Sequence, residues 1–437
     1  MNKIGNLFKG DKGIWTVFLF LCLISVVEVF SASSTLTYKS QNYLSPLIYH
    51  CSTIFLGVLV AIVTLNIPCR YFKLITPLML LLSYATLVGV LVFGESINGA
   101  NRVIQLPGFT FQPSEIAKGT MVLFTAQILS ALQREDGNGA DPLAMKYILW
   151  VTLPAILLIG MENLSTAVLL FAVIYTMMFL GRMPWKQMAK LTGAVVLGGV
   201  MFVGLVFVVG GMDEEAAQEL ADMKAGVKSE APAQAKERSK LEIFTHRFGT
   251  WRNRLMGLGS ADDPADPKEY KITDKNFQVT HANLAIASSG VIGKGPGNSV
   301  ERDYLPQAFS DFIYAIIIEE MGIAGAVLVV FLYVVLLFRG ARIASRCENN
   351  FPAFLVLGLA LLLVYQAVIN MAVAVDFGIV TGQPLPLVSK GGSSTIVNCA
   401  YIGAILSVSR SAKRLQPLKV SKPEEEGQAD TASGQEG

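Results

Sequence analysis

Carboxylates stand beside and inside an apolar stretch of the sequence, DYLPQAFSDFIYAIIIEEMG, residues 303–322. Asp311 lies where a polar segment meets the apolar one, and Glu319 and Glu320 follow inside the apolar part. An acid within a membrane-length apolar segment is costly, so each is a candidate functional group until a partner or a water-filled cavity explains it. Asp311 also has a structural interpretation, because Asp is a favoured N-cap residue, although Ser310 is an equally good cap.

A second group of charged residues lies in NGANRVIQLPGFTFQPSEIAK, residues 98–118. The segment Gln112–Glu115 predicts a helix start, with Pro113 at the first helical position and an acid in the first turn. Lys118 lies three residues after the acid, within pairing distance on a helix, which by itself indicates a capped helix with an ion pair. Arg102 adds a guanidinium, and cations gathered at a membrane edge suit a lipid diphosphate.

A third group lies in VTGQPLPLVSKGGSSTIVN, residues 380–398. Its prolines prevent a regular helix, and the segment from Lys390 to Ser393 and beyond offers backbone amides and hydroxyls for an anion, although such runs are also typical of plain turns. The glycine-rich segment SSGVIGKGPGNS, residues 288–299, has neither Walker spacing nor a strand–turn–helix setting, so nucleotide binding is not indicated.

The composition indicates that these groups belong to a membrane protein. Of the 437 residues, 52% are hydrophobic and only 16% are charged, whereas charged residues make up about 25% of soluble domains. The five cysteines lie in or beside apolar runs and suggest neither a disulfide framework nor a metal quartet. The net charge of +2 says little about partners, and no nucleic acid is expected.

Apolar runs of membrane-spanning length predict an all-α polytopic membrane protein with about ten transmembrane helices and one large extracytoplasmic loop. The predicted spans are 14–33, 47–66, 72–94, 114–133, 146–161, 164–181, 189–210, 311–338, 351–375 and 392–411.

Basic residues collect in every second short loop, which places both termini in the cytoplasm. The expected organisation is a cytoplasmic N-terminus (1–13), helices one to seven (14–210), the large extracytoplasmic loop (211–310), helices eight to ten (311–412) and a disordered cytoplasmic tail (413–437). Within the large loop, residues 213–240 are rich in Ala, Glu and Lys and are interpreted as a surface insertion. From Ile243 onward the loop first mixes aromatic residues with arginines (243–259), and residues 276–306 are apolar and then glycine-rich. This predicts a re-entrant or interfacial element that caps the membrane domain.

Four motifs occur in order and together resemble one family. They are NGANRVIQLPGFTFQPSEIAK, GKGPGNS with YLPQAFSDFIYAIIIEEMGIAG, QAVIN at 366–370, and TGQPLPLVSKGGSS. They resemble the shape, elongation, division and sporulation (SEDS) family of bacterial cell-wall polymerases, over nearly the whole chain apart from 213–240 and the tail. The resemblance implies a peptidoglycan glycosyltransferase that acts on lipid II outside the cytoplasmic (inner) membrane. It also implies a class B penicillin-binding protein and other divisome membrane proteins as partners.

Two positions depart from the family pattern. The sequence has Glu162 and Asn163 in MENLSTAV, where the family usually has Pro-Asp, which puts the acidic role of that Asp in doubt. It has SKGGSS where SYGGSS is more usual, so Lys390 stands at the expected outer face. That lysine either assists phosphate binding or is a snorkelling, solvated side chain.

The implied reaction can be compared with the residues present. An acceptor hydroxyl attacks an anomeric carbon while a lipid diphosphate leaves, so the site needs a base and cations. The match of SDFIYAIIIEE to the family's acidic motif makes Asp311 the catalytic candidate, with Glu319 and Glu320 as buried hydrogen-bonding acids. The substrate-binding candidates are Arg102, Gln112, Glu115, Lys118, Arg247, Lys390 and Ser393, with Arg254 as a further cation. A divalent cation, Mg²⁺ or Mn²⁺, stays open, because no carboxylate cage is visible.

Other functions use the same features. A lipid II flippase or transporter would use the intramembrane charges for passage and would tolerate loss of the base, and a non-catalytic division scaffold would need only helix surfaces. Within the polymerases, GDKGIWTVF, VFSASS and TGQPLPLVSKGG resemble division-type members more than elongation-type ones.

Overall fold

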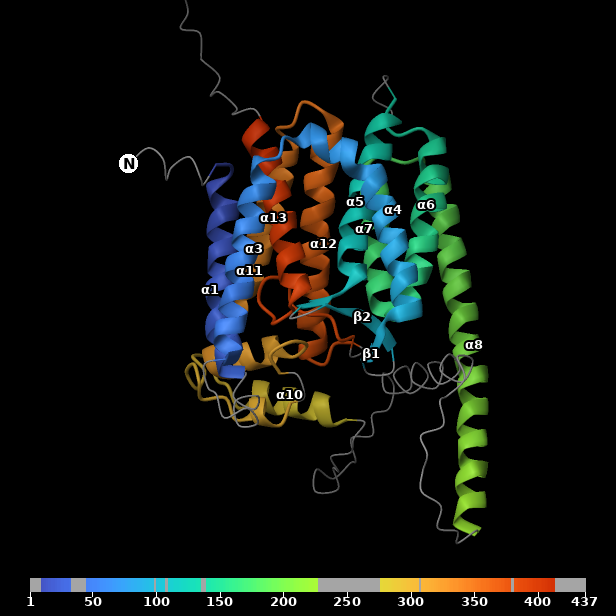
Figure 1. The fold of residues 1–437 in the computed structure, drawn as a ribbon, viewed down its shortest axis with the longest axis vertical. Helices are drawn as coiled ribbons and strands as arrows, with labels where there is room; N and C mark the ends of the chain where they lie inside the picture. The colour runs from blue at the N-terminus through green and yellow to red at the C-terminus, as the bar shows by residue number, and fades with distance from the viewer. Residues whose placement is uncertain are drawn as a thin grey trace, which may run out of the picture.

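The computed structural model describes residues 9–32, 45–97, 100–106, 109–134, 139–226, 276–305, 308–378 and 381–412. Each predicted span coincides with a helix in this part of the chain (Figure 1). The helices are α1 (Lys12–Ala32), α3 (Ser45–Asn66), α4 (Cys69–Phe93), α5 (Pro113–Ala131), α6 (Pro142–Glu162), α7 (Leu164–Leu180), α8 (Trp185–Gly226), α11 (Ile313–Ala344), α12 (Asn350–Ala374) and α13 (Ser393–Ser411).

The all-α polytopic fold class is confirmed. Within the described residues, seven helices are long and apolar enough to cross a membrane: α1, α3, α4, α6, α8 over Trp185–Val209, α11 and α12. Helix α7 is apolar but has 17 residues, and α5 and α13 are less apolar than the seven. The count of ten crossings therefore stays a prediction.

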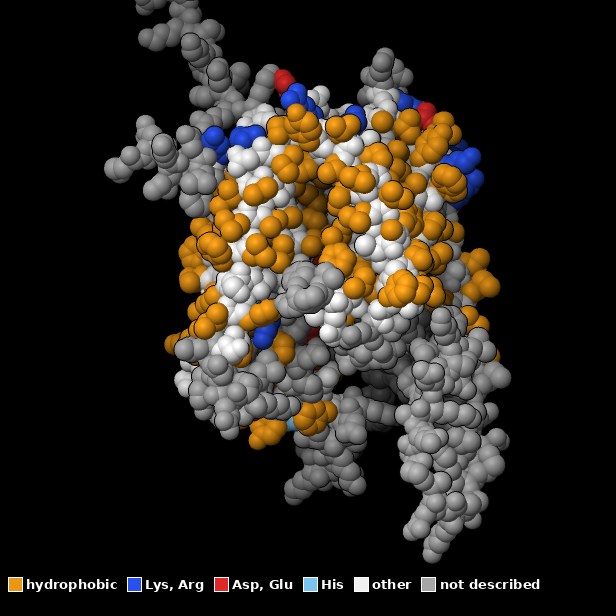
Figure 2. All heavy atoms as spheres, in the orientation of Figure 1, with side chains coloured by type: hydrophobic (Ala, Val, Ile, Leu, Met, Phe, Trp, Pro, Cys, Tyr) orange, Lys and Arg blue, Asp and Glu red, His pale blue; other side chains and the backbone are white. Residues whose placement is uncertain are grey.

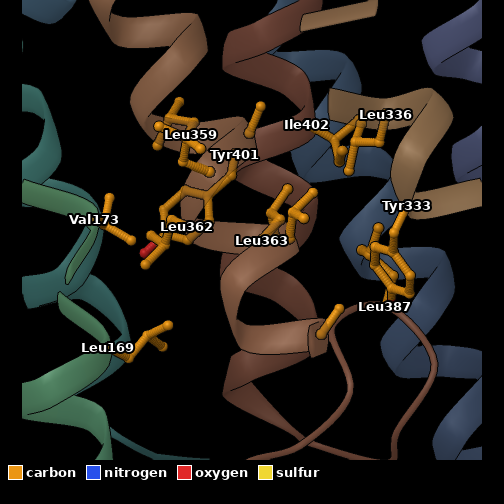
Figure 3. Close-up of a cluster of buried hydrophobic side chains, with 14 of the residues drawn as sticks. Leu169, Val173, Tyr333, Leu336, Leu359, Leu362, Leu363, Leu387, Tyr401 and Ile402 are labelled. Atoms are coloured by element: carbon orange, nitrogen blue, oxygen red, sulfur yellow. The ribbon is translucent and has the colours of Figure 1, made fainter. Parts of the chain in front are cut away.

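Helix α12 lies inside the bundle and packs against α5, α7, α11 and α13. Figure 3 shows Leu359, Leu362 and Leu363 of this helix among buried side chains of α7, α11 and α13. Helix α8 stands at the edge of the bundle (Figure 1), where Thr192 hydrogen-bonds Tyr175 of α7 at 2.7 Å. A side chain on α12 can therefore contact several other helices at once.

The two ends of the bundle differ. At one end, which we call the basic end, the start of α1 meets the end of α13, where the Asp11 amide donates to Ser409 Oγ at 2.9 Å. Lys and Arg side chains gather at this end, and hydrophobic side chains cover the sides of the bundle (Figure 2). The opposite end, which we call the capped end, carries a small sheet, the short helix α10 (Phe277–Ala287) and the 381–392 segment (Figure 1).

The sheet was not expected from the sequence. Strands β1 (Glu95–Ile97), β2 (Ala100–Leu106) and β3 (Phe109–Phe111) pair antiparallel in the order β1-β2-β3, with Ile104 opposite Phe111 and Leu106 opposite Phe109. The signal was present but short: two segments of alternating or aromatic residues flank Pro-Gly, which is typical of a hairpin. The strands pack on α4, α5 and α13.

The single span predicted over 311–338 is wrong in one respect, because α11 breaks at Gly322. This residue has φ +70° and ψ −171° inside the helix. The first part, Ile313–Met321, crosses the capped end next to α10, and the rest runs through the bundle (Figure 1). The break depends on a close approach of two glycines: a Cβ on Gly322 would lie 2.3 Å from the Val291 carbonyl oxygen, and one on Gly293 would lie 2.3 Å from the Glu320 carbonyl oxygen.

The glycine-rich segment satisfies the backbone groups that the break exposes. The amides of Lys294 and Gly295 donate to the carbonyls of Glu319 and Glu320 at 2.9 and 2.8 Å. In return, the amides of Ile323 and Ala324 donate to the carbonyls of Gly290 and Val291 at 3.3 and 3.2 Å. An unpaired backbone group at membrane depth would cost several kcal/mol, so the segment and the break stabilise each other.

The same segment explains Glu319 and Glu320, which are confirmed as buried hydrogen-bonding acids. Glu319 accepts from Lys294 Nζ at 2.6 Å, from the Val300 amide at 3.0 Å and from Ser299 Oγ. Glu320 accepts from the amides of Gly297 and Ser299 at 3.0 and 3.2 Å and from Ser31 Oγ of α1. The 288–299 segment is thus a nest of N–H groups for the protein's own carboxylates.

We expect Gly322→Ala to lower the stability of the purified protein by more than about 2 kcal/mol, because it adds backbone strain and a clash with the Val291 carbonyl. Gly290→Ala is the matched control, since Gly290 has φ +69° but open space around its Cβ position. Thermal unfolding in detergent measures both. Equal losses in the two variants would mean that the close approach contributes nothing.

Candidate functional site

Three segments far apart in the sequence meet at the capped end: the start of α5, the turn before α11 and the 381–392 segment. The Gln112 amide donates to Ser393 Oγ at 3.1 Å, which joins α5 to the start of α13. Ser389 Oγ donates to the Ser310 carbonyl at 2.6 Å, and the Lys390 amide donates to the Phe309 carbonyl at 3.0 Å. The structure therefore brings the predicted groups around 112, 311 and 390 together.

Asp311 lies in the turn before α11 and is half-buried. The helix begins at Ile313 with Phe312 as N-cap, and no side chain makes a capping hydrogen bond there, so the capping interpretation of Asp311 is wrong. Its Oδ1 accepts from Ser310 Oγ at 2.9 Å, and its carbonyl oxygen accepts from Asn370 Nδ2 at 2.8 Å. The residue is thus held through both its backbone and its side chain, and it is partly exposed to solvent.

Glu115 and Lys118 form the predicted ion pair, but deep inside the bundle. Lys118 Nζ lies 2.9 Å from Glu115 Oε1, and the side chains are 0% and 2% exposed for Lys118 and Glu115. Lys118 Nζ also donates to Gln366 Oε1 at 2.7 Å. An ammonium has three donors, so one remains, but the pair is enclosed by protein in this structure. Tyr401 adds a third link, because its hydroxyl donates to the Glu115 carbonyl.

Lys390 is the more accessible cation. Its ammonium lies 5.1 Å from the centroid of the Phe309 ring, a cation–π arrangement, and is half-buried. The ammonium makes neither a hydrogen bond nor an ion pair with the residues that the structure describes. Burial lowers the pKa of this ammonium below its ordinary value of 10.5. Such a charge favours an anionic ligand, which would replace the lost solvation.

The other predicted site residues lie in three different parts of the chain. Gln112 and Ser393 join α5 to α13 through the hydrogen bond described above, and Gln112 Nε2 also donates to Ser114 Oγ at 3.2 Å. Arg102 lies in β2, whose neighbour β3 packs against α13. Arg247 and Arg254 lie outside the described residues.

At the first departure from the family pattern, Asn163 has a structural task. It ends α6 and is the N-cap of α7, where its Oδ1 accepts from the Ser165 amide at 3.0 Å. Glu162 is buried beside it at the end of α6. Asn and Asp are about equally good N-cap residues, so Asn163 keeps the cap that the family's usual Asp would supply.

Sequence reasoning missed the polar residues that hold the site together. Gln366 and Asn370 of α12, Gln383 and Ser389 are all buried, and each hydrogen-bonds a neighbouring segment. The signal was QAVIN, which places two amides four residues apart, on one face of an otherwise apolar helix. Among the residues described, no three His, Cys, Asp or Glu side chains are grouped so that they could hold a metal ion.

The model of the FtsW/RodA/SpoVE family, described as cell cycle proteins, matches residues 11–214 and 243–414. The chain belongs to this family. The gap in the match coincides with the segment interpreted as an insertion.

This chain is 28% identical over 410 residues to a protein of Haemophilus influenzae, covering 91% of this chain and 90% of the relative. It is 29% identical over 419 residues to a protein of Halomonas elongata, covering 92% of each. Both relatives are named probable peptidoglycan glycosyltransferase FtsW.

Solved structures share the fold. A chain of a peptidoglycan synthase complex that coordinates polymerization and crosslinking superimposes with a TM-score of 0.64 at 23% identity, covering 92% of this chain and 98% of that one. The rod shape determining protein RodA of Thermus thermophilus superimposes with a TM-score of 0.59 at 22% identity, covering 94% and 99%. This chain therefore shares its overall helical fold with both structures.

We expect Lys118→Met to destabilise the protein by about 3–5 kcal/mol, because it leaves a buried Glu115 carboxylate without its counter-charge. The double variant Lys118→Met/Glu115→Gln removes both charges and should recover most of that loss. Thermal unfolding of the three proteins in detergent measures the difference. A double variant as unstable as the single one would show that the ion pair is not what stabilises this part of the bundle.

Proposed function

We propose that this protein is a peptidoglycan glycosyltransferase that polymerises lipid II into glycan strands during cell division. Its family and the names of its relatives support the reaction class. The observation that carries the proposal is the pair of hydrogen bonds that joins the segments of Asp311 and Lys390, from Ser389 Oγ to the Ser310 carbonyl and from the Lys390 amide to the Phe309 carbonyl. An acid and an accessible cation held together at one membrane edge are what the transfer of a lipid-linked sugar requires.

The reaction then assigns a role to each group. The Asp311 carboxylate accepts the proton of the acceptor sugar hydroxyl while the hydroxyl oxygen bonds to the anomeric carbon of the donor. The bond between that carbon and the diphosphate oxygen breaks, and the lipid diphosphate leaves with the electron pair. Lys390 stabilises the developing negative charge from its half-buried position. Lys118 contributes its positive charge from deeper in the bundle, where Glu115 partly balances that charge.

The proposal includes an orientation in the bacterial inner membrane. The basic end, where Asp11 and Ser409 meet, faces the cytoplasm, because Lys and Arg collect on that side (Figure 2). Both termini are then cytoplasmic, and the capped end with its site faces outward, where lipid II carries its sugars.

A crosslinking partner belongs to the same proposal. The solved complex with the same fold coordinates polymerization and crosslinking. We infer that a class B penicillin-binding protein binds this chain in the membrane, together with other membrane proteins of the division machinery. The naming of the relatives as FtsW favours division over elongation.

Asp311→Asn tests the catalytic assignment, because it keeps the size of the side chain and removes the base. We expect glycan polymerisation by purified protein to be abolished, while insertion and lipid II binding are retained. Asp376→Asn is the matched control: Asp376 is an exposed acid just after α12, with φ +59°, a conformation that Asn tolerates. Robust glycan synthesis by Asp311→Asn would contradict the assignment. Lipid II translocation without glycan synthesis by the wild-type protein would favour the transporter alternative.

The pH dependence of substrate affinity tests Lys390. Its contact with a diphosphate needs the protonated ammonium, which is present below its pKa and is lost as the pH rises through that value. Because burial lowers this pKa, the KM for lipid II should rise earlier on the alkaline side than a free lysine would allow. In Lys390→Arg, which stays charged, the rise should move to higher pH. Superimposable KM profiles for the two proteins would exclude Lys390 from diphosphate binding.

A further inference from the structure

Two side-chain amides on one face of α12 connect the acidic and cationic parts of the site. Gln366 and Asn370 are one helical turn apart, a rise of about 6 Å, and both are buried. Gln366 Oε1 accepts from Lys118 Nζ at 2.7 Å, and its Nε2 donates to the Pro384 carbonyl at 3.0 Å. Asn370 Nδ2 donates to the Asp311 carbonyl at 2.8 Å and to the Gln383 carbonyl at 2.7 Å.

Each side-chain amide therefore binds one charged residue of the site and one backbone carbonyl, and the two carbonyls belong to consecutive residues, Gln383 and Pro384. The orientation of Asn370 is fixed, because both of its Nδ2 partners are carbonyl oxygens and a flipped amide would offer them no donor. Gln366 is fixed in the same way, since its partners are an ammonium donor and a carbonyl acceptor. Neither side chain can exchange its two contacts.

The 383–386 segment needs these donors. Its sequence, Gln-Pro-Leu-Pro, cannot form a regular helix. The Leu385 carbonyl accepts from the Ser389 amide at 2.9 Å, whereas the carbonyls of Gln383 and Pro384 accept from the side-chain amides of α12. The remaining groups are fixed from other sides: the Leu385 amide donates to Ser389 Oγ at 2.7 Å, and Gln383 Nε2 donates to Thr166 Oγ1 of α7 at 2.6 Å. Ser389 Oγ in turn donates to the Ser310 carbonyl, next to Asp311. The segment is a rigid bridge between α12 and the turn that carries the acid.

We propose that Gln366 and Asn370 are positioning residues. Because their spacing along α12 is fixed, their hydrogen bonds set the separation between Lys118 and Asp311. The inference rests on the proposed function. Helix α12 packs against α5, α7, α11 and α13, so its backbone is held in place from several sides. Asn370 sets the position of the Asp311 backbone, and hence the reach of its carboxylate, without touching the substrate.

The expected signature follows from this role. A base displaced by about 1 Å lowers a reaction rate by up to about 100-fold, whereas ground-state binding of lipid II does not depend on the base. Asn370→Ala should therefore lower kcat by about 10- to 100-fold and leave the KM for lipid II within about 2-fold of the wild-type value. A merely structural loss would reduce the amount of folded protein and leave the kcat of the folded fraction unchanged.

Asn370→Asp separates hydrogen-bond donation from packing. It has the same size as Asn370 and loses both donors when ionised, so its kcat should fall as in Asn370→Ala. Protonation of the new carboxyl returns one donor, so the ratio of its kcat to that of the wild-type protein should rise as the pH is lowered. Tyr365→Phe is the matched control on the same helix, because the Tyr365 hydroxyl hydrogen-bonds Thr176 at 2.9 Å, away from the site.

The test measures kcat and KM for lipid II polymerisation with purified, active-site-titrated protein across pH for the wild type and the three variants. The inference predicts low kcat in both Asn370 variants, a pH-dependent recovery in Asn370→Asp alone, and wild-type values in Tyr365→Phe. Two results with an active wild type would overturn this inference and leave the proposed function standing. One is an unchanged kcat in Asn370→Ala, and the other is a pH-independent ratio of the Asn370→Asp kcat to the wild-type kcat. An inactive wild type would overturn the proposed function and this inference with it.

Discussion

Every stretch of non-helical backbone at membrane depth must find its hydrogen bonds inside the protein, and the capped end is organised by that requirement. The break in α11 at Gly322 is satisfied by amides and carbonyls of the 290–295 segment. The proline-containing segment after α12 is satisfied by the side-chain amides of Gln366 and Asn370. Both solutions join parts of the chain that are distant in sequence, so the same bonds that satisfy the backbone also assemble the site.

The carboxylates near the start of α11 have different fates because of these bonds. Glu319 and Glu320 each accept several hydrogen bonds and lie beside Lys294 and Arg302, which suits a structural role. Asp311 is half-buried: its carboxylate accepts from Ser310 Oγ, and its carbonyl oxygen accepts from Asn370 Nδ2. The two cations differ in a parallel way: Lys118 is enclosed by its partners, and Lys390 extends over the Phe309 ring. A stable framework thus surrounds the acid and the cation to which we assign the reaction.

Much of this organisation was predictable from the sequence. The helices follow from runs of apolar residues, because membrane spans have a length and a composition that a sequence displays directly. The Glu115–Lys118 pair and the start of α5 follow from local spacing, and Pro113 fixes that start. The break at Gly322 did not follow, because it depends on the approach of Gly293, 29 residues away, which no local pattern encodes. The roles of Gln366 and Asn370 were missed for the same reason, since their partners lie in three other segments of the chain.

The central claim is that Asp311 and Lys390 face one lipid-linked diphosphate sugar at the capped end. Electron cryomicroscopy of the Asp311→Asn protein with lipid II in lipid nanodiscs tests it most directly, because the substrate would bind without reacting. The account predicts that the diphosphate lies against Lys390 and that a sugar hydroxyl lies within hydrogen-bond reach of residue 311. Density for the diphosphate at the basic end, or on the lipid-facing side of the helices away from both residues, would contradict it.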